Sequence, residues 1–296
     1  MIKKEQQHTV YETLSEGKDI LKNADIDTFD LDSRILLSYI LGMEHHLFIS
    51  NPKTIVPTKQ YKEYLKLIKR RVKKEPIAQI TKEKEFWALP FKITKHTLIP
   101  RPDSETLIEG VKSEFKDINA PHKIIDLGTG SGCLLLALLS EYKNATGVGI
   151  DISQNAVKTA SQNAKKLSFD NRTQILKYSW HNKLPHKKIK DVKFNIIISN
   201  PPYITKNDMK KLNIDVKKYE PHSALYGGND GLTEYRKLAK SLYYWNIITP
   251  KGKVFLEIGK GQENDIKKIF EAFGFKFLHY FKDLNGIIRV IELQKE

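Results

Sequence analysis

The sequence Asn200-Pro201-Pro202-Tyr203 combines groups that could hold and orient a planar amino group. Two consecutive prolines remove two backbone donors, so neither a helix nor a strand can continue through them. A planar –NH2 conjugated to a carbonyl or an aromatic ring is a poor nucleophile, because its lone pair is delocalised. The Asn200 side-chain oxygen and the Pro201 carbonyl are two acceptors for its N–H bonds, and the Tyr203 ring is a flat surface for stacking. We therefore expect catalysis by Asn200, Pro201 and Tyr203 and substrate binding by all four residues, with a simple turn as the alternative.

A second motif, "IIDLGTGSG", predicts a strand that runs into a glycine-rich turn before a helix. Gly128, Gly130 and Gly132 would let the backbone approach a ligand closely, which suits any nucleotide-like molecule. Asp126 precedes them, where a carboxylate would repel a pyrophosphate. Asp151 ends the next strand-like run, "GVGID", where a carboxylate can accept both ribose hydroxyls. The pair of acids favours adenosine without phosphates, and so S-adenosylmethionine over NAD.

Trp180 follows the third predicted strand, at the level where the base of a nucleoside would lie. Its ring could form an aromatic wall for adenine. A half-buried core tryptophan is the competing interpretation, and the sequence leaves both open.

The elements that must position these residues alternate between strands and helices from Lys123 onward. Strands are predicted at 124–126, 147–151, 174–177, 194–199 and 253–258, and helices at 133–141, 155–167, 233–245 and 264–273. Repeated βα units indicate a parallel, doubly wound α/β sheet. The last two strands, "FKFLHYF" and "GIIRVIEL", have no room between them for a crossover helix, so the final strand should be antiparallel.

The first 75 residues or so have helical periodicity. A helix is expected over Leu31–Gly42, with Asp32 or Ser33 as its N-cap and a glycine stop. Another carries one apolar stripe, formed by Tyr61, Tyr64, Leu65, Ile68 and Val72. The period then changes, and Glu85–Ile99 suggests a hairpin before a helix from about Asp103 to Asp117.

Composition bounds the class of protein. The 296 residues are 40% hydrophobic and include one cysteine. We find no signal peptide and no apolar run long enough to span a bilayer, so we expect a cytoplasmic protein. We also find no Cys/His cluster with zinc spacing, so we expect no metal. The net charge is +15, yet only 7 of the 50 basic residues are Arg, the residue that dominates bidentate phosphate recognition. The lysine clusters at 59–74 and 177–193 are either solvated surface or a patch for an acidic or RNA-bound partner.

Six segments together resemble the bacterial release-factor glutamine methyltransferases: "LIPRPDSE", "IIDLGTGSG", "GVGID", "IIISNPPYI", "EPHSALYGGNDGL" and "FLEIGKGQ". The resemblance runs from about Glu75 to the C-terminus, and "IPRPDSE" and "EPHSALYGGNDGL" are its specific parts. It implies a helical substrate-recognition domain (1–78), a β-hairpin linker (79–100) and a Rossmann-like class I methyltransferase domain (101–296) with a seven-stranded sheet. The implied activity is methylation, by S-adenosylmethionine, of the glutamine amide in the Gly-Gly-Gln motif of class 1 peptide chain release factors.

Carried over to this chain, the resemblance gives a set of cofactor-binding residues: Gly128, Thr129, Gly130, Ser131, Gly132, Asp151, Trp180 and Asn200. Arg101 and Glu105 match the "PRPD-E" segment, and an orienting pair is as good an explanation for them as any catalytic role. Two positions depart from the family pattern: Ser179 replaces an aspartate that would contact the adenine amino group, and Ile288 stands where polar residues are usual.

Two other functions compete with this one. An adenine-N6 methyltransferase acting on DNA or RNA would use the same Asn-Pro-Pro-Tyr on a flipped base, and the basic surplus favours it. A catalytically silent adapter would use only the lysine clusters. Release factors are the expected partners; contact with nucleic acid is allowed but not required, and no membrane is expected.

Overall fold

The computed structural model describes residues 7–183 and 185–296, which form two compact units. The N-terminal unit ends at Glu83 and also includes Asn213–Tyr219. The second unit, called the sheet unit here, consists of Lys84–Leu212 and Glu220–Glu296. Within the described residues no helix is both long and apolar enough to cross a membrane.

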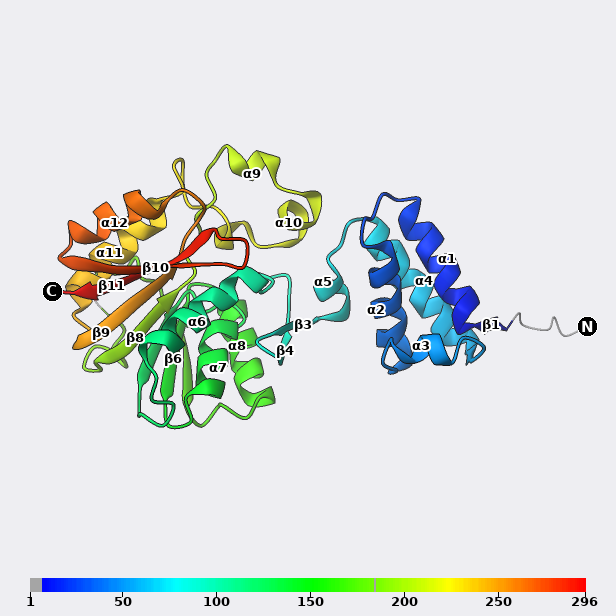
Figure 1. The fold of residues 1–296 in the computed structure, drawn as a ribbon, viewed down its shortest axis with the longest axis horizontal. Helices are drawn as coiled ribbons and strands as arrows, with labels where there is room; N and C mark the ends of the chain where they lie inside the picture. The colour runs from blue at the N-terminus through cyan, green and yellow to red at the C-terminus, as the bar shows by residue number, and fades with distance from the viewer. Residues whose placement is uncertain (1–6, 184) are drawn as a thin grey trace, which may run out of the picture. The chain divides into compact units, whose positions relative to one another are not determined.

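A seven-stranded sheet forms the centre of the sheet unit, in the order β10-β11-β9-β8-β5-β6-β7 (Figure 1). Its strands are β5 (Lys123–Leu127), β6 (Thr146–Asp151), β7 (Thr173–Lys177), β8 (Phe194–Ser199), β9 (Ile248–Glu257), β10 (Phe275–Lys282) and β11 (Ile288–Lys295). The pairs from β7 to β9 are parallel, whereas β11 runs antiparallel to both β9 and β10. The predicted class I methyltransferase fold, with its antiparallel last strand, is confirmed.

Helices cover both faces of this sheet (Figure 1). On one face lie α6 (Glu105–Glu114), which follows the short helix η1 (Pro102–Ser104), then α7 (Cys133–Glu141) and α8 (Gln154–Lys166). The other face carries α11 (Thr233–Trp245) and α12 (Glu263–Glu271). The central strands are apolar on both sides because both are covered, and their core includes Ile197, Val254, Leu256, Trp245 and Phe270.

The hairpin ahead of the sheet is shorter than predicted. Strands β3 (Glu83–Phe86) and β4 (Leu89–Lys92) are joined through Trp87 and Ala88, both at positive φ, as a tight two-residue turn requires. The predicted extension to Ile99 is wrong, because the chain leaves the ladder after Lys92 and forms a loop. That loop carries residues 96–101 toward the carboxyl edge of the sheet, where several of them line a cavity.

The N-terminal unit is helical, as predicted, with one small antiparallel sheet. Its elements are β1 (His8–Thr9), α1 (Val10–Lys22), α2 (Phe29–Leu41), α3 (Leu47–Ser50), β2 (Ile55–Val56), α4 (Thr58–Val72), α5 (Ile77–Thr81) and α10 (Ile214–Tyr219). The predicted stripe on α4 faces the core: Tyr64 and Ile68 are fully buried, and Tyr61, Leu65 and Val72 pack against the same cluster.

The cap predicted for α2 is wrong. The helix begins at Phe29 with Thr28 as N-cap, one turn before Asp32 and Ser33, while the predicted glycine stop at Gly42 is confirmed by its left-handed conformation. Asp32 is instead a buried residue within the helix, where its carboxylate accepts hydrogen bonds from Thr28 Oγ1 (2.7 Å) and Arg71 Nε (2.7 Å). An acidic residue in a first turn suits the helix dipole whether or not it is the cap, so the sequence cue was ambiguous.

Three short elements between β8 and α11 were not predicted: α9 (Asp208–Lys211), α10 and η2 (His222–Ala224). Helix α10 belongs to the N-terminal unit, where the Gln79 side chain donates to the Tyr219 carbonyl (2.5 Å) and the Tyr219 hydroxyl donates to the Lys73 carbonyl (2.9 Å). The next residue, Glu220, is already part of the sheet unit.

Candidate active site

An open cavity lies at the carboxyl edge of the parallel strands and is formed within the sheet unit. Most of the residues predicted to bind cofactor or substrate line it: Gly128, Thr129, Gly130, Ser131, Asp151, Trp180, Asn200 and Pro202. The other three predicted residues, Gly132, Pro201 and Tyr203, are not part of the lining. Its lining combines loop backbone, a carboxylate, an indole and an amide, which are the kinds of group that can bind a nucleoside derivative.

The glycine loop approaches this cavity with its backbone. Gly128 has φ +86° and Gly130 has φ +56°, a region where any side chain would be strained. The amides of Gly128 and Thr129 both donate to the Ile150 carbonyl (2.9 Å each), which fixes the loop to the end of β6. Gly132 has another role: it precedes α7, and a Cβ there would lie 3.3 Å from Ala160 on α8, so its size serves helix packing.

Asp151 ends β6 and faces the cavity with its carboxylate held by the backbone. Its Oδ2 accepts from the Gly130 amide (2.9 Å) and its Oδ1 from the Ser153 amide (2.8 Å). Each oxygen keeps a further lone pair, so the group can still accept two hydroxyl donors. Burial raises the pKa of Asp151, while these two backbone bonds act in the opposite direction. The geometry suits a ribose diol.

Ile152, the next residue, was not predicted as part of the site. It lines the cavity with 61% of its surface exposed, which is unusual for a large aliphatic side chain. An apolar residue directly after the acid, outside the strand, is the sequence signal that would have found it. The side chain can cover the face of a base.

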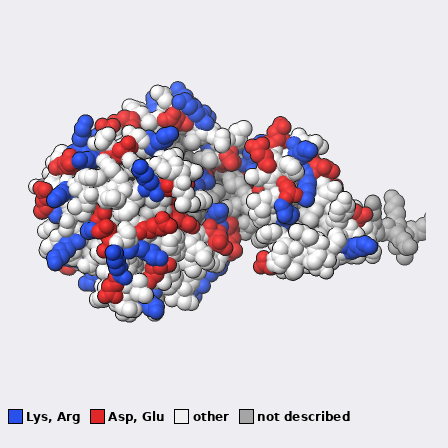
Figure 2. Space-filling view, viewed as in Figure 1, with Lys and Arg blue, Asp and Glu red and all other residues white. Residues whose placement is uncertain are grey.

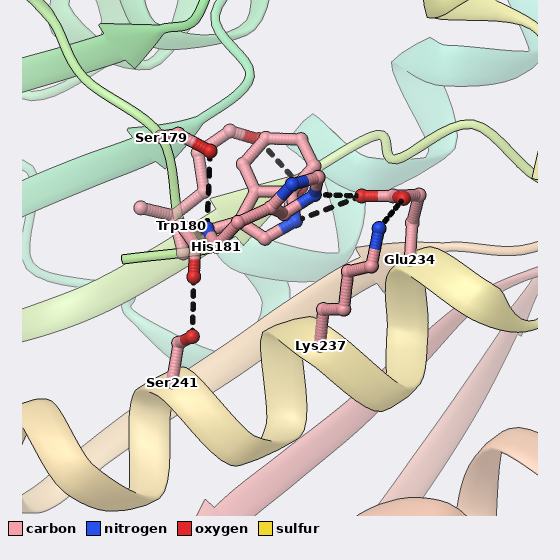
Figure 3. Close-up of polar contacts among 8 residues, drawn as sticks. Ser179, Trp180, His181, Glu234, Lys237 and Ser241 are labelled. Atoms are coloured by element: carbon pink, nitrogen blue, oxygen red, sulfur yellow. Dashed lines mark hydrogen bonds and ion pairs between the residues drawn. The ribbon is translucent and has the colours of Figure 1, made fainter. Parts of the chain in front are cut away.

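Trp180 lines the cavity and is held by a polar network from α11 (Figure 3). Its indole Nε1 donates to Glu234 Oε2 (3.1 Å), which also contacts His181 Nε2 (2.6 Å), while Lys237 Nζ donates to Glu234 Oε1 (2.9 Å). Burial would raise the pKa of Glu234, but the bonds from His181 and Lys237 outweigh it and lower that pKa. The carboxylate therefore stays ionised and fixes the indole.

The Trp180 ring is half-buried against the core and also lines the cavity, so its role as a wall for adenine stays a prediction. Ser179, which departs from the family pattern, accepts the His181 amide through its Oγ (3.1 Å; Figure 3). It closes the turn that carries Trp180. Ile288, the second departure, starts β11 and packs half-buried against the core.

The Asn-Pro-Pro-Tyr segment leaves β8 beside the glycine loop. The Asn200 side chain lines the cavity, and its Nδ2 lies 3.5 Å from Ser104 Oγ. Pro201 is buried, which holds its carbonyl in place, and the Tyr203 carbonyl accepts from Gln262 Nε2 (3.1 Å). Burial raises the pKa of Tyr203 well above its usual value, so its phenol stays neutral.

Arg101 and Glu105 do not pair, contrary to the expectation of an orienting pair. Arg101 lines the cavity and forms an ion pair with Glu220, whose side chain is 1% exposed. Glu220 also accepts the Ile99 amide through Oε2 (3.0 Å). Glu105 accepts the Trp87 amide instead (3.0 Å). The two segments that made the family resemblance specific, "IPRPDSE" and "EPHSALYGGNDGL", thus meet at Glu220.

Two carboxyl groups are buried beneath the cavity. Asp126 is 1% exposed and accepts from Thr129 Oγ1 (2.7 Å), and burial raises its pKa to about 7. It supports the glycine loop through Thr129 and is not among the residues that line the cavity. Glu257, at the end of β9, is 3% exposed, and burial raises its pKa to about 7 as well.

Comparison with known families matches both parts of the chain. Residues 12–81 match the family described as PrmC N-terminal domain, and residues 118–229 match the methyltransferase domain family. A solved structure, the hMettl16 catalytic domain in complex with a MAT2A 3′UTR hairpin, is similar in fold with a TM-score of 0.56. It is 12% identical and covers 82% of this chain and 85% of that one.

Full-length relatives extend the match over nearly the whole chain. A release factor glutamine methyltransferase of Bradyrhizobium diazoefficiens is 36% identical over 278 residues, which cover 93% of this chain and 91% of that protein. A bifunctional methyltransferase of Rickettsia typhi is 35% identical over 306 residues, which cover 97% of this chain. The chain spans only 57% of the length of that bifunctional relative.

Proposed function

Because this chain belongs to the release factor glutamine methyltransferase family, we propose that it methylates a glutamine side-chain amide of class 1 peptide chain release factors. The methyl donor is S-adenosylmethionine and the target is the glutamine of the Gly-Gly-Gln motif. The observation that carries this proposal is that Asn200 and the glycine loop line one cavity. The same assignment makes residues 1–78 a substrate-recognition domain, 79–100 a linker and 101–296 the catalytic domain, in a cytoplasmic enzyme.

The residues of the cavity fit S-adenosylmethionine. The Asp151 carboxylate has room for the ribose hydroxyls, Ile152 and Trp180 are apolar surfaces for adenine, and Gly128 and Gly130 leave the loop backbone open to a ligand. Arg101 is a cation in the same wall, and the guanidinium N–H groups beyond its pair with Glu220 can donate to a ligand carboxylate. When bound, S-adenosylmethionine supplies an electrophilic methyl group on a positively charged sulfur.

The chain's own task is to make the amide nitrogen nucleophilic. Asn200 Oδ1 and the Pro201 carbonyl accept its two N–H bonds, which orients the nitrogen lone pair into the cavity. The buried, doubly proline-flanked carbonyl cannot turn away, and Tyr203 gives the Asn-Pro-Pro-Tyr segment a rigid aromatic support. Such a site needs no strong base before transfer, because the proton can leave to water once the nitrogen has gained its methyl group.

The adenine-N6 alternative shares the amide-holding residues and therefore the chemistry. Two observations favour a protein substrate. The Arg101–Glu220 pair builds the cavity wall from the two segments specific to this family. On the face shown in Figure 2, Lys and Arg are interspersed with Asp and Glu, and this face lacks the single-sign field that a nucleic-acid groove requires.

The decisive experiment offers both substrates to one enzyme. Unmodified release factor, a variant with glutamate in place of the Gly-Gly-Gln glutamine, and unmodified RNA and DNA are each incubated with radiolabelled S-adenosylmethionine. The expected result is label on the wild-type release factor only. Label on nucleic acid alone would establish the adenine-N6 methyltransferase alternative. If no substrate were labelled, a catalytically silent adapter would be the remaining function.

A further inference from the structure

Glu257 lies beside Asn200 where two parallel strands end. In the register of β8 and β9, Ser199 pairs with Leu256, so the next residues on the two strands are Asn200 and Glu257. The Glu257 carboxyl is 3% exposed. Its Oε1 lies 3.5 Å from the Tyr203 hydroxyl, and its Oε2 has no hydrogen-bond partner among residues 7–183 and 185–296. A buried acceptor in this state calls for an explanation.

The surroundings of this carboxyl include Asn200, one of the two residues proposed to accept the N–H bonds of the substrate amide. Its pKa is raised first by burial and lowered by the Ser104 hydroxyl, by Arg289 and by the Asn200 amide, while Asp103 raises it. Arg289 does not neutralise it directly, because its hydrogen bonds go to Asp103 Oδ2 and Asp283 Oδ2 (2.8 Å each). The Tyr235 hydroxyl donates to the Glu257 backbone carbonyl (2.7 Å) and so leaves the side chain alone.

An asparagine amide can face either way, and only one way serves the reaction. The proposed chemistry needs Oδ1 toward the substrate, with Nδ2 toward the protein. An ionised carboxylate only accepts hydrogen bonds, so it favours Nδ2 on its own side and Oδ1 on the other. A protonated carboxyl can donate to Oδ1 and removes that preference. We propose that Glu257 is a positioning residue whose ionised side chain fixes the Asn200 amide with Oδ1 facing the substrate. This inference rests on the proposed function.

The proposal predicts a pH dependence of the methyl-transfer step. The pKa of Glu257 is about 7, so the group changes its ionisation within the physiological range. Below that pKa the carboxyl is neutral and Asn200 loses its enforced orientation. The single-turnover rate should therefore rise with pH through an apparent pKa near 7 and level off above it.

The test compares the wild type with Glu257→Gln, which keeps the shape but can both donate and accept. At pH 8 its single-turnover rate on the release factor should fall about 10- to 100-fold, as expected for the loss of one charged hydrogen bond. Its affinity for S-adenosylmethionine and the KM for the release factor should change less than about twofold. The rise of its single-turnover rate with pH near 7 should disappear.

Glu292→Gln is the matched control. Glu292 is a buried glutamate of the same sheet (1% exposed) whose pKa is also raised by burial, but its partner is Lys253. This variant should keep the wild-type rate and the rise of that rate with pH near 7. Thermal unfolding of both variants separates a folding defect from a catalytic one.

Three results would overturn the inference. The Glu257→Gln enzyme could have the wild-type rate, or its rate could still rise with pH near 7. The third is a wild-type rate that does not change from about pH 6 to 8. The last measurement needs no variant, so the inference stays testable if Glu257→Gln fails to fold. Failure of the proposed function would look different, because the wild type itself would then leave the release factor unlabelled.

Discussion

The indole of Trp180 lies against the backbone of Gly128 so closely that a Cβ at Gly128 would stand 2.9 Å from the ring atom Cζ3. The glycine loop and the aromatic wall of the cavity are therefore one packed unit. The hydrogen bond from Trp180 to Glu234 extends this unit to α11. Residues from three separate parts of the chain thus set the shape of one end of the site.

Gly128→Ala should weaken binding of S-adenosylmethionine by more than tenfold, because the new methyl group displaces Trp180 and the backbone is strained at φ +86°. Isothermal titration gives the affinity. Gly274→Ala is the control for strain alone, since Gly274 has φ +73° with nothing within 4 Å of its Cβ position. It should cost about 1 kcal/mol of stability and leave the affinity unchanged. If both variants bound S-adenosylmethionine with equal affinity, displacement of Trp180 by the new methyl group could not be the cause.

Asn200→Ala should abolish methyl transfer while binding of S-adenosylmethionine is largely kept, because the substitution removes the side chain proposed to hold the substrate amide. We expect a rate loss of at least about 10²-fold, typical of a lost transition-state contact. Incorporation of radiolabelled methyl groups into the release factor measures it, with the affinity for the cofactor determined in parallel. Near-normal turnover would show that Asn200 does not orient the amide.

Glu234→Ala should weaken cofactor binding about three- to tenfold at an unchanged saturated rate, because Trp180 loses the acceptor for its indole N–H. Lys237→Ala is the matched control on the same helix. Lys237 also donates to the Glu234 carboxylate, but 42% of its own side chain is exposed, so solvent screens this pair and its loss should cost little. The change in KM for S-adenosylmethionine relative to kcat is the informative measurement. If both substitutions weakened cofactor binding equally, the effect would come from the lost charge and not from the hydrogen bond to Trp180.

Asp126→Asn should alter how stability depends on pH. The folded-state pKa of Asp126 is raised to about 7 from an ordinary value of 3.8, so the folded protein holds a proton that the unfolded chain has released. The contribution of Asp126 to the free energy of unfolding therefore decreases as pH rises from about 4 to 7, and it does not change further above pH 7. Asparagine cannot titrate, so the variant should gain stability over the wild type across this window. Urea unfolding at pH 5 and pH 8 measures the gain, and a difference independent of pH would contradict the assignment.

The parallel sheet was predictable because its strands are buried on both faces and so contain unbroken apolar runs such as Ile196–Ile198. The boundaries of β8, α7 and α11 agree with the prediction to the residue. Residue type was less informative at the ends of elements. Asp32 is a residue type that often caps helices, but here it pairs with Arg71. The hairpin ends at Lys92, before the predicted end.

The lining of the candidate cavity was predictable where it depends on backbone shape or on one motif, as for Gly128, Asp151 and Asn200. The partners that fix those residues were not, since Glu234, Glu220 and Glu257 reach the site only through the tertiary fold. A glutamate in a sequence gives no sign of which strand will lie beside it. For the same reason Arg101 was matched with its neighbour in sequence, Glu105, whereas its partner follows 119 positions later.

The return of the chain into the N-terminal unit has a consequence for its biogenesis. The chain passes between the two units three times, after Glu83, Leu212 and Tyr219. Gln79 cannot meet the Tyr219 carbonyl until the ribosome has added 140 more residues, a delay on the order of ten seconds. The N-terminal helices therefore emerge first but complete their packing late, after β5 to β8 of the sheet have been synthesised. A single proteolytic cut after Glu83 would not release them, because α10 remains attached to the chain on both sides.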